Sequence, residues 1–370
     1  MSPRILILTA SVGEGHDAPA RRLADQLRAE SPGVTVEIED CLEAMGRAVS
    51  VVSDNAARVV FFRFLWLWDV GFWMFAGFAL TRRLTQSMLV RFGSRGLLSL
   101  IAAHRPDIVV STYPHATEVL GRLRRARRLQ VPVCAVITDL AGLRYWATPG
   151  ADLHLVTHPE SIPEVKSIAG DDADVHCVHG FTAPEFLEPR DPAAARRALG
   201  LAPRAKIVLV SGGGWGVGDV EGAVREVLAV RGVDQVVCLC GHNKELREQL
   251  VRDFADDPRL RAEPFTDHMP DWLAAADALV HSTGGLTVLE AIMRGCPAIS
   301  YGWGRGHVRA HNRAFKRFGL AAVASTPAAL RDAVSTALVE GRRAVELPEL
   351  PSAASLVLAG ADRPGTAHAA

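Results

Sequence analysis

The segment that decides the fold is residues 4–20, RILILTASVGEGHDAPA. Its first six residues are a largely apolar run of strand length, and small or polar residues follow as a loop over 10–16. A helical pattern covers 19–30, and a second strand-like run, VTVEIED, occupies 34–40. A strand, a helix and a second strand in this order predict a βαβ unit with both strands parallel in one sheet.

The same alternation of apolar runs and helical patterns continues along the chain and restarts after a stretch rich in proline, alanine and arginine. A chain of 370 residues also exceeds the usual size of a single core. We therefore predict an α/β protein with two doubly wound, Rossmann-like domains. The predicted parts are an N-terminal domain at 1–182, a linker with a short helix at 183–205, a C-terminal domain at 206–350 and a disordered tail at 351–370.

Composition restricts the class of protein. Hydrophobic residues make up 49% and charged residues 22%, as in folded globular proteins. The 41 basic and 41 acidic residues cancel, so the global charge argues neither for nor against nucleic acid. No nucleic-acid-binding module surrounds the basic run RLRRARR at 122–128, so we predict no nucleic-acid partner. We expect that run to be solvated surface, with anionic headgroups as alternative ligands. Six cysteines without a CxxC pair predict buried free thiols. A first strand without a leader predicts a cytoplasmic protein.

His16 ends the loop after the first predicted strand. Open α/β sheets bind ligands at the carboxyl ends of their strands, so His16 is placed to take a proton from a substrate near neutral pH. Gly13 and Gly15 would let the backbone approach a phosphate or a reacting group closely. The loop is neither GxGxxG nor a Walker loop, which argues against dinucleotide binding and ATP hydrolysis. Alternatively, His16 only caps or packs a helix. Asp139 and Glu14 are candidates to orient its ring.

Two further small-residue turns lie in the second half. SGGGWGVG at 211–218 follows an apolar strand, and HSTGGLTVLEAIMRGCP at 281–297 reads as a strand end, a turn and a helix. Glu290, within that helix, could accept hydrogen bonds from two ribose hydroxyls. The alternatives are a structural turn for the first segment and a surface ion pair for Glu290. Free N–H groups at the helix start could bind a diphosphate, and they belong to Thr283, Gly284 and Gly285.

Residues 59–80, VVFFRFLWLWDVGFWMFAGFAL, break the alternating pattern. The segment is long enough to span a membrane, but Arg63 and Asp69 would each cost about 2.5–3.5 kcal/mol in hydrocarbon. Its aromatic residues and the arginines that follow favour a helix lying at the headgroup level or contacting a lipid acceptor. A buried helix or hairpin is the alternative. We expect peripheral contact with an anionic membrane, at the inner face of the plasma membrane.

Taken together, the three small-residue motifs resemble glycosyltransferase family 28 in order and spacing. ILILTASVGEGH and VITDLAGLRYW, at 136–146, are similar to the branch that contains monogalactosyldiacylglycerol synthases and processive diacylglycerol glucosyltransferases. The aromatic segment falls where that branch carries its membrane-associating insertion. The resemblance covers residues 4–320 by order of elements, and its specific part is confined to the motifs.

The resemblance implies a GT-B fold, with two domains facing across a cleft. It also implies inverting transfer of a sugar from a UDP-sugar to a hydroxyl of a lipid or other hydrophobic acceptor, with no tightly bound cofactor and no metal. In this interpretation His16 is the general base and residues 283–285 face the diphosphate. The other implied donor contacts are Gly213, Gly214, Trp215, Phe265, Thr266, Glu290, Arg309 and Asn312.

Two positions depart from the family pattern. Leu143 stands where the diacylglycerol branch carries a histidine. Val308 and Arg309, shortly before Asn312, stand where family members carry a glutamine followed by an acidic or amide residue. Because those side chains contact sugar hydroxyls, the donor sugar is left open. Arg309 could instead face the carboxylate of a uronic acid.

Three other functions fit parts of the sequence. A nucleotide-sugar 2-epimerase would share the fold but needs no lipid-facing surface. A silent module would bind a nucleotide sugar without turnover. A glycosyltransferase acting on a hydrophobic natural product would use the aromatic segment to line its acceptor pocket.

Overall fold

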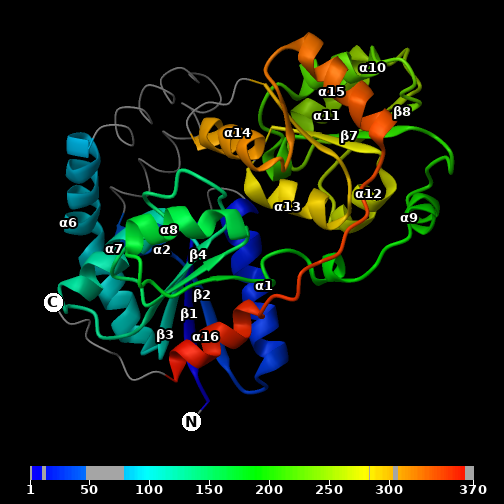
Figure 1. The fold of residues 1–370 in the computed structure, drawn as a ribbon. Helices are drawn as coiled ribbons and strands as arrows, with labels where there is room; N and C mark the ends of the chain where they lie inside the picture. Colours follow the sequence, from blue (N-terminus) through cyan, green and yellow to red (C-terminus); the bar gives the residue numbers. More distant parts are fainter. Residues whose placement is uncertain (1, 11–13, 47–78, 283, 303–306, 363–370) are drawn as a thin grey trace. The chain divides into compact units, whose positions relative to one another are not determined.

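The computed structural model describes the chain except for residues 1, 11–13, 47–78, 283, 303–306 and 363–370 (Figure 1). It contains two compact units. Unit 1 comprises 1–182, 305–307 and 349–370, and unit 2 comprises 183–304 and 308–348. The aromatic segment 59–80 lies outside the described residues apart from its last two, so its contact with membrane or lipid stays a prediction.

Unit 1 is built on a six-stranded parallel sheet in the order β2-β1-β3-β4-β5-β6. Its strands are β1 (Arg4–Thr9), β2 (Thr35–Asp40), β3 (Ile108–Ser111), β4 (Val133–Ile137), β5 (Leu153–Val156) and β6 (Val175–Cys177). The central strands are almost wholly apolar and buried, as a parallel sheet covered on both faces requires. The predicted parallel sheet of the first half is therefore confirmed.

Successive residues of β1 supply two different cores, because strand side chains alternate between the faces of a sheet. Ile5 and Ile7 pack with α1 (Glu14–Glu30) and α16 (Ala353–Ala361). Leu6 and Leu8 pack with α2 (Cys41–Met45), α6 (Ala79–His104) and α7 (Pro114–Arg125). A smaller cluster lies beside β6 and α8 (Ile162–Ala169).

The C-terminal segment corrects one sequence prediction. Residues 351–370 were expected to form a disordered tail, but 353–361 form helix α16, which lies against α1 in unit 1 (Figure 1). Ser352 caps this helix by accepting the backbone N–H of Ser355 at 3.3 Å, and Val357 is fully buried. Small apolar residues carry little helical signal alone, and the partner of this helix lies more than 300 residues earlier in the chain.

Unit 2 contains a second six-stranded parallel sheet, in the order β12-β11-β10-β7-β8-β9. Its strands are β7 (Ile207–Ser211), β8 (Gln235–Leu239), β9 (Leu260–Glu263), β10 (Ala278–His281), β11 (Ala298–Tyr301) and β12 (Ala322–Ala324). Its helices after β7 are α10 (Val220–Leu228), α11 (Lys244–Asp253), α12 (Met269–Ala275), α13 (Gly285–Met293), α14 (His307–Phe318) and α15 (Pro327–Glu340).

The segment expected to be a linker, 183–205, belongs to unit 2. It contains a 3₁₀ turn, η4 (Pro184–Leu187), and the short helix α9 (Pro192–Ala198), which packs on α12. Arg196 fixes α9 by donating to the carboxylate of Asp277 and to the carbonyl of Ala275, both at 2.9 Å. These contacts hold the segment as a structured part of the second unit.

Each sheet has one place where the strand order reverses. From β1 the chain passes to β2 on one side and later to β3 on the other, and β7 lies in the same way between β8 and β10. Ligands of open α/β sheets bind at the carboxyl ends of the strands at this switch point. The loops after β1 and β3, and those after β7 and β10, are therefore the candidate site of each unit. Among the described residues, no helix is long and apolar enough to cross a membrane.

Candidate active site

His16 lies in the first turn of α1, because the helix begins at Glu14. The sequence prediction placed it on the loop before the helix, and that boundary was wrong by one turn. Pro19 lacks the N–H that would bond to the carbonyl of Gly15 within the helix. The hydroxyl of Thr138, just after β4, approaches that carbonyl at 3.5 Å instead. A residue from another strand end thus supports the turn that carries His16.

The imidazole of His16 is held by a backbone carbonyl and two aromatic rings. Its Nδ1 lies 3.1 Å from the carbonyl oxygen of Thr112, which follows β3. The Tyr113 ring meets it edge-on at 5.1 Å between centroids, and the Trp146 ring lies at 5.4 Å. Because a carbonyl oxygen can only accept, Nδ1 carries the proton and Nε2 presents its lone pair.

Burial lowers the pKa of His16 below its usual value of 6.5. The negative charge of Asp139, the hydrogen bond to Thr112 and the charge of Asp17 oppose this shift, in decreasing order. His16 is therefore neutral at pH 7 and able to accept a proton. The carbonyl of Thr112 is the hydrogen-bond partner of Nδ1 where the sequence suggested a carboxylate from Asp139 or Glu14, and the Glu14 candidate stays a prediction. Asp139 instead accepts a hydrogen bond from Trp146 Nε1 at 3.0 Å; the Glu14 side chain lies outside the described residues.

A second histidine, His115, lies in the same group of rings and was missed by the sequence analysis. Its ring is 5.1 Å from that of Tyr113 and 6.3 Å from that of Tyr145. Burial and the nearby His16 lower the pKa of His115 to about 4. The signal was available, since TYPHATE at 112–118 directly follows the buried strand β3, much as SVGEGH follows β1. The rule that selected His16 therefore applies to His115 as well.

The glycine-rich segment after β7 forms a tight turn in unit 2. Gly213 and Gly216 have φ of 70° and 61°, in the left-handed region that favours glycine. The 3₁₀ turn η5 (Gly213–Trp215) contains Gly213, Gly214 and Trp215. The Gly214 carbonyl accepts the backbone N–H of His242 at 2.8 Å. This contact holds the turn against the loop that follows β8.

The turns after β7 and β10 pack against each other at the switch point of unit 2. The hydroxyl of Ser282 donates to the carbonyl of Val217. A Cβ on Gly218, which has φ of 102°, would lie 2.6 Å from Ser282. Gly284 caps α13 without a side-chain hydrogen bond, and Gly285 begins the helix, so the N-terminus of α13 lies at this turn. Thr283 lies outside the described residues.

The remaining candidate donor contacts are spread over unit 2. Glu290 lies in the second turn of α13 and is half-buried. Phe265 follows β9 and stacks on His242 at 4.1 Å and 11°, and Thr266 beside it accepts the N–H of His268. Asn312 and the half-buried Arg309 lie on α14, with Asn312 accepting the hydroxyl of Ser300 at 2.7 Å. The described contacts do not join these residues into one cluster.

Leu143 is a core residue in this chain. Its side chain is fully buried with Ile137, Trp146 and Val156, and its N–H donates to Glu164 at 3.0 Å. An apolar side chain here packs beneath Trp146, one of the rings beside His16. Leu143, which stands where the diacylglycerol branch carries a histidine, therefore acts on the site only by packing against Trp146 in the same cluster.

The basic run at 122–128 is not uniformly solvated, which corrects that expectation. Arg124 is buried and makes two hydrogen bonds to the carboxylate of Asp152, at 2.6 and 3.0 Å. Arg122 pairs with Glu118 at 2.6 Å. The exposed remainder comprises Arg125, Arg127 and Arg128.

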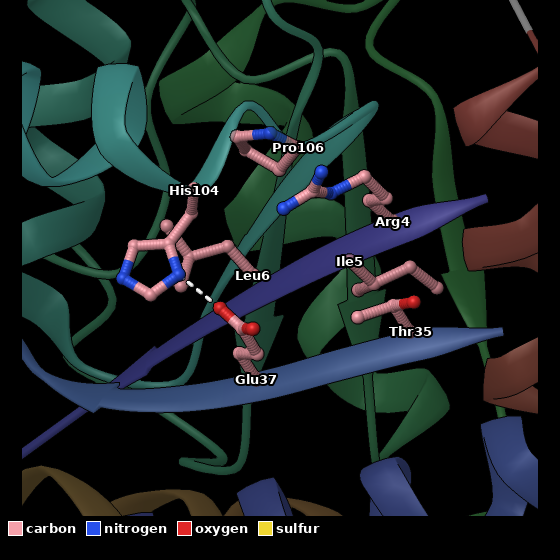
Figure 2. Close-up of a pocket in the computed structure, with 7 residues that line it drawn as sticks. All are labelled: Arg4, Ile5, Leu6, Thr35, Glu37, His104 and Pro106. Atoms are coloured by element: carbon pink, nitrogen blue, oxygen red, sulfur yellow. Dashed lines mark hydrogen bonds and ion pairs between the residues drawn. The ribbon is translucent and has the colours of Figure 1, made fainter.

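Figure 2 shows a small hollow at the end of the first sheet that is opposite to the switch point. It is lined by Arg4, Ile5, Leu6, Thr35, Glu37, His104 and Pro106. Here His104 pairs with Glu37 through Nδ1 and with Glu39 at 3.4 Å through Nε2. The hollow lies at the amino ends of β1 and β2, away from the switch point. Its ion pairs tie the end of α6 to β2, which is a structural role.

Among the described residues, the cysteines and the potential metal ligands form no further candidate site. All six cysteines are buried free thiols, as predicted. Within the described part of the chain, no group of three or more histidine, cysteine, aspartate or glutamate side chains is placed to hold a metal ion.

Comparison with known proteins matches the two units separately. Residues 16–178 match the family model of monogalactosyldiacylglycerol (MGDG) synthase, and residues 207–348 match that of the glycosyltransferase family 28 C-terminal domain. The processive diacylglycerol beta-glucosyltransferase of Staphylococcus epidermidis is 25% identical over 342 residues, 90% of this chain and 84% of the relative. The enzyme of the same name from Staphylococcus aureus is 25% identical over 327 residues, covering 88% and 82%.

Solved structures agree on the fold. MurG of Acinetobacter baumannii superposes with a TM-score of 0.57 at 17% identity, over 96% of this chain and 98% of that one. The glycosyltransferase SnogD of Streptomyces nogalater gives 0.58 at 17% identity, over 98% and 100%. The two parallel sheets are those of the GT-B fold, and the paired family matches extend over most of both units. The chain therefore belongs to glycosyltransferase family 28 and is a GT-B glycosyltransferase.

Proposed function

We propose that the protein transfers a sugar from a UDP-sugar to the hydroxyl of a diacylglycerol-like lipid, with inversion at the anomeric carbon and with His16 as the general base. The observation that carries this proposal is the state of His16. Its ring is neutral, its Nδ1 is bonded to Thr112, and its Nε2 lone pair is at the switch point of unit 1. The relatives named as diacylglycerol glucosyltransferases support the lipid acceptor.

In the proposed reaction, Nε2 of His16 takes the proton of the acceptor hydroxyl. The resulting oxygen nucleophile forms a bond to the anomeric carbon of an α-linked donor. The bond from that carbon to the diphosphate oxygen breaks, and UDP leaves with the electron pair. A β-glycoside results. The positive end of the α13 dipole, at Gly285, would stabilise the charge that develops on the diphosphate.

The proposal assigns the donor to unit 2 and requires no bound metal or tightly bound cofactor. Phe265, stacked on His242, offers an aromatic surface to the base. Glu290 would accept the ribose hydroxyls, and the turn at 213–215 would contact the sugar and phosphates. Arg309 and Asn312 would face the donor sugar, and Arg309 would suit a carboxylate.

A transfer assay tests the whole proposal. The purified enzyme is incubated with vesicles containing diacylglycerol and with UDP-glucose, UDP-galactose, UDP-GlcNAc or UDP-glucuronate. We expect a β-linked glycolipid from at least one donor, and NMR of the anomeric proton gives its configuration. Donor breakdown that does not depend on acceptor would favour an epimerase, and an α-linked product would contradict inversion.

Donor binding should depend on unit 2 and not on His16. At roughly 100 times its Kd, a UDP-sugar stabilises the folded state by about 2.7 kcal/mol and should raise the melting temperature by several degrees. Glu290→Ala should abolish most of this rise because the ribose loses its acceptor, whereas His16→Ala should keep it. Differential scanning fluorimetry against GDP- and dTDP-sugars measures both effects. An undiminished rise in Glu290→Ala would contradict the ribose assignment.

The pH dependence of transfer should follow His16. Transfer requires the neutral imidazole, so kcat/KM should fall as the pH drops through a pKa below 6.5. Asp139 is the largest influence that raises this pKa, so Asp139→Asn should move the acidic limb to still lower pH. Profiles of kcat/KM between about pH 4.5 and 8 measure the shift. A limb that moves upward, or does not move, would contradict the role of His16.

We also propose that helix α6 contacts an anionic membrane surface. Leu84, Met88 and Phe92 are 57%, 50% and 60% exposed and recur every fourth residue, so they form one apolar stripe. Arg83, Arg91 and Arg95 are exposed on the same helix, and residues 79–104 contain no aspartate or glutamate. Apolar side chains beside cations, on a helix that itself contains no carboxylate, suit the boundary between headgroups and acyl chains.

Replacing the stripe by Leu84→Ser, Met88→Ser and Phe92→Ser should weaken binding to vesicles containing phosphatidylglycerol by about tenfold or more. Cosedimentation at several salt concentrations measures this, with neutral phosphatidylcholine vesicles as the reference. The matched control is Val251→Ser with Val339→Ser, which removes two exposed apolar side chains from unit 2. Equal binding by the triple variant and the control would exclude α6 as the contact.

A further inference from the structure

His115 and His16 contact the same tyrosine from two elements of unit 1. His16 lies in the first turn of α1, and His115 lies in the first turn of α7. Each imidazole meets the ring of Tyr113 at 5.1 Å between centroids and close to a right angle, 89° for His16 and 82° for His115. The two rings are therefore placed by one shared neighbour at the β1–β3 switch point.

The polar atoms of the two rings differ in their partners. Nδ1 of His16 is bonded to the carbonyl of Thr112. Nδ1 of His115 is buried and has no hydrogen-bond partner among the residues that the structure describes. A buried polar atom without a partner is unfavourable in the free protein, so a ligand that supplies the missing hydrogen bond is favoured.

His154 shows that an unpaired nitrogen alone is not sufficient. Its Nδ1 is also buried without a partner in the described part of the chain. However, the side chain is fully buried within β5, and its Nε2 accepts the N–H of Thr148 at 3.4 Å. His115 is instead a partly exposed residue, and it lies beside the proposed base.

We propose that His115 is an acceptor-binding residue that donates a hydrogen bond from Nδ1 to an ester carbonyl of the glycerolipid. This assignment rests on the proposed function. A diacylglycerol has one hydroxyl, which His16 would deprotonate, and its other polar atoms are ester oxygens that can only accept. A second imidazole that stays neutral can donate to such an oxygen without placing a positive charge beside His16. The low pKa of His115 meets that requirement.

The test compares a diacylglycerol with its dialkyl ether analogue, which keeps the hydroxyl and lacks both carbonyls. The wild type should show a KM about tenfold lower for the ester than for the ether, the effect of one well-made hydrogen bond. His115→Phe should raise the KM for the ester to that for the ether and leave the KM for the donor unchanged. His115→Asn keeps a donor near the position of Nδ1 and should restore most of the preference. His154→Asn, which alters a buried histidine away from the site, should keep it fully.

The outcomes separate this assignment from the proposed function. No transfer by the wild type to either lipid overturns the proposed function, and the role of His115 falls with it. Transfer to both lipids with equal KM overturns only the role of His115, without need of any variant. A His115→Phe variant that folds and keeps the ester preference does the same. If His115→Phe does not fold, the ester preference of His115→Asn decides the question. Loss of that preference together with a raised KM for the donor would indicate that His115 has a structural role.

Discussion

Replacing His16 by alanine is expected to lower kcat/KM for transfer by about 10²–10⁴-fold, the usual contribution of a positioned general base. The side chain lies between Tyr113 and Trp146, with Nδ1 bonded to the carbonyl of Thr112. Alanine removes the proton acceptor but no residue of unit 2, so the donor should bind as before. The measurement is initial rates at saturating donor with varied lipid acceptor.

The matched control is His176→Ala. His176 lies on β6 of the same unit, is partly exposed and pairs with Asp174. This change should leave kcat/KM within about twofold of the wild-type value. Exposed ion pairs contribute little to stability, so the variant should remain folded. If His16→Ala retained the rate of the His176 variant, the proposed base would be wrong even though the family assignment would stand.

Replacing Asp152 by alanine is expected to destabilise unit 1 by about 3–5 kcal/mol, the cost of leaving a buried charge without its partner. The Arg124 side chain is only 3% exposed, and its guanidinium also donates to the carbonyls of Leu129 and Gln130. Asp152 in turn accepts the N–H of Val133 at 2.8 Å, at the start of β4. One carboxylate thus joins α7, β4 and the segment before β5.

Urea unfolding, followed by hydrogen exchange of the β4 and β5 peptides, measures this effect within unit 1. The control is Glu248→Ala, which breaks the exposed pair between Glu248 and Arg252 on α11 and should cost less than about 0.5 kcal/mol. A loss in Asp152→Ala no larger than in the control would mean that Arg124 is satisfied by the two carbonyls alone.

The sheets could be predicted from the sequence because their strands are continuous apolar runs whose pattern is local. β1, β2, β7 and β10 all lie where those runs predict them. Helix starts were less certain. Pro19 predicts a helix start near residue 19, but α1 begins at Glu14, and the hydroxyl of Thr138 lies 3.5 Å from the Gly15 carbonyl that the proline leaves open. That contact joins residues 123 positions apart and leaves no local signal.

Part of the candidate site could be predicted from the sequence and part could not. His16 and the glycine turns have distinctive local patterns. His115 follows its strand in the same way, but its significance comes from the Tyr113 ring that it shares with His16 and from a nitrogen that the described residues leave unpaired, and only the fold shows these. Arg124 sits in a run of arginines that reads as surface, and only the fold brings Asp152 to it.

Helix α16 has a consequence for the order in which the protein is made. Its residues 353–357 complete the core that Ile5 and Leu27 begin, and Gly360 lies so near Ile108 that an added Cβ would be 3.0 Å away. A ribosome releases the first 182 residues long before it releases these. The unit that emerges first must therefore wait, with the part of its core beside α1 that α16 covers still open, until residues 353–361 have been synthesised.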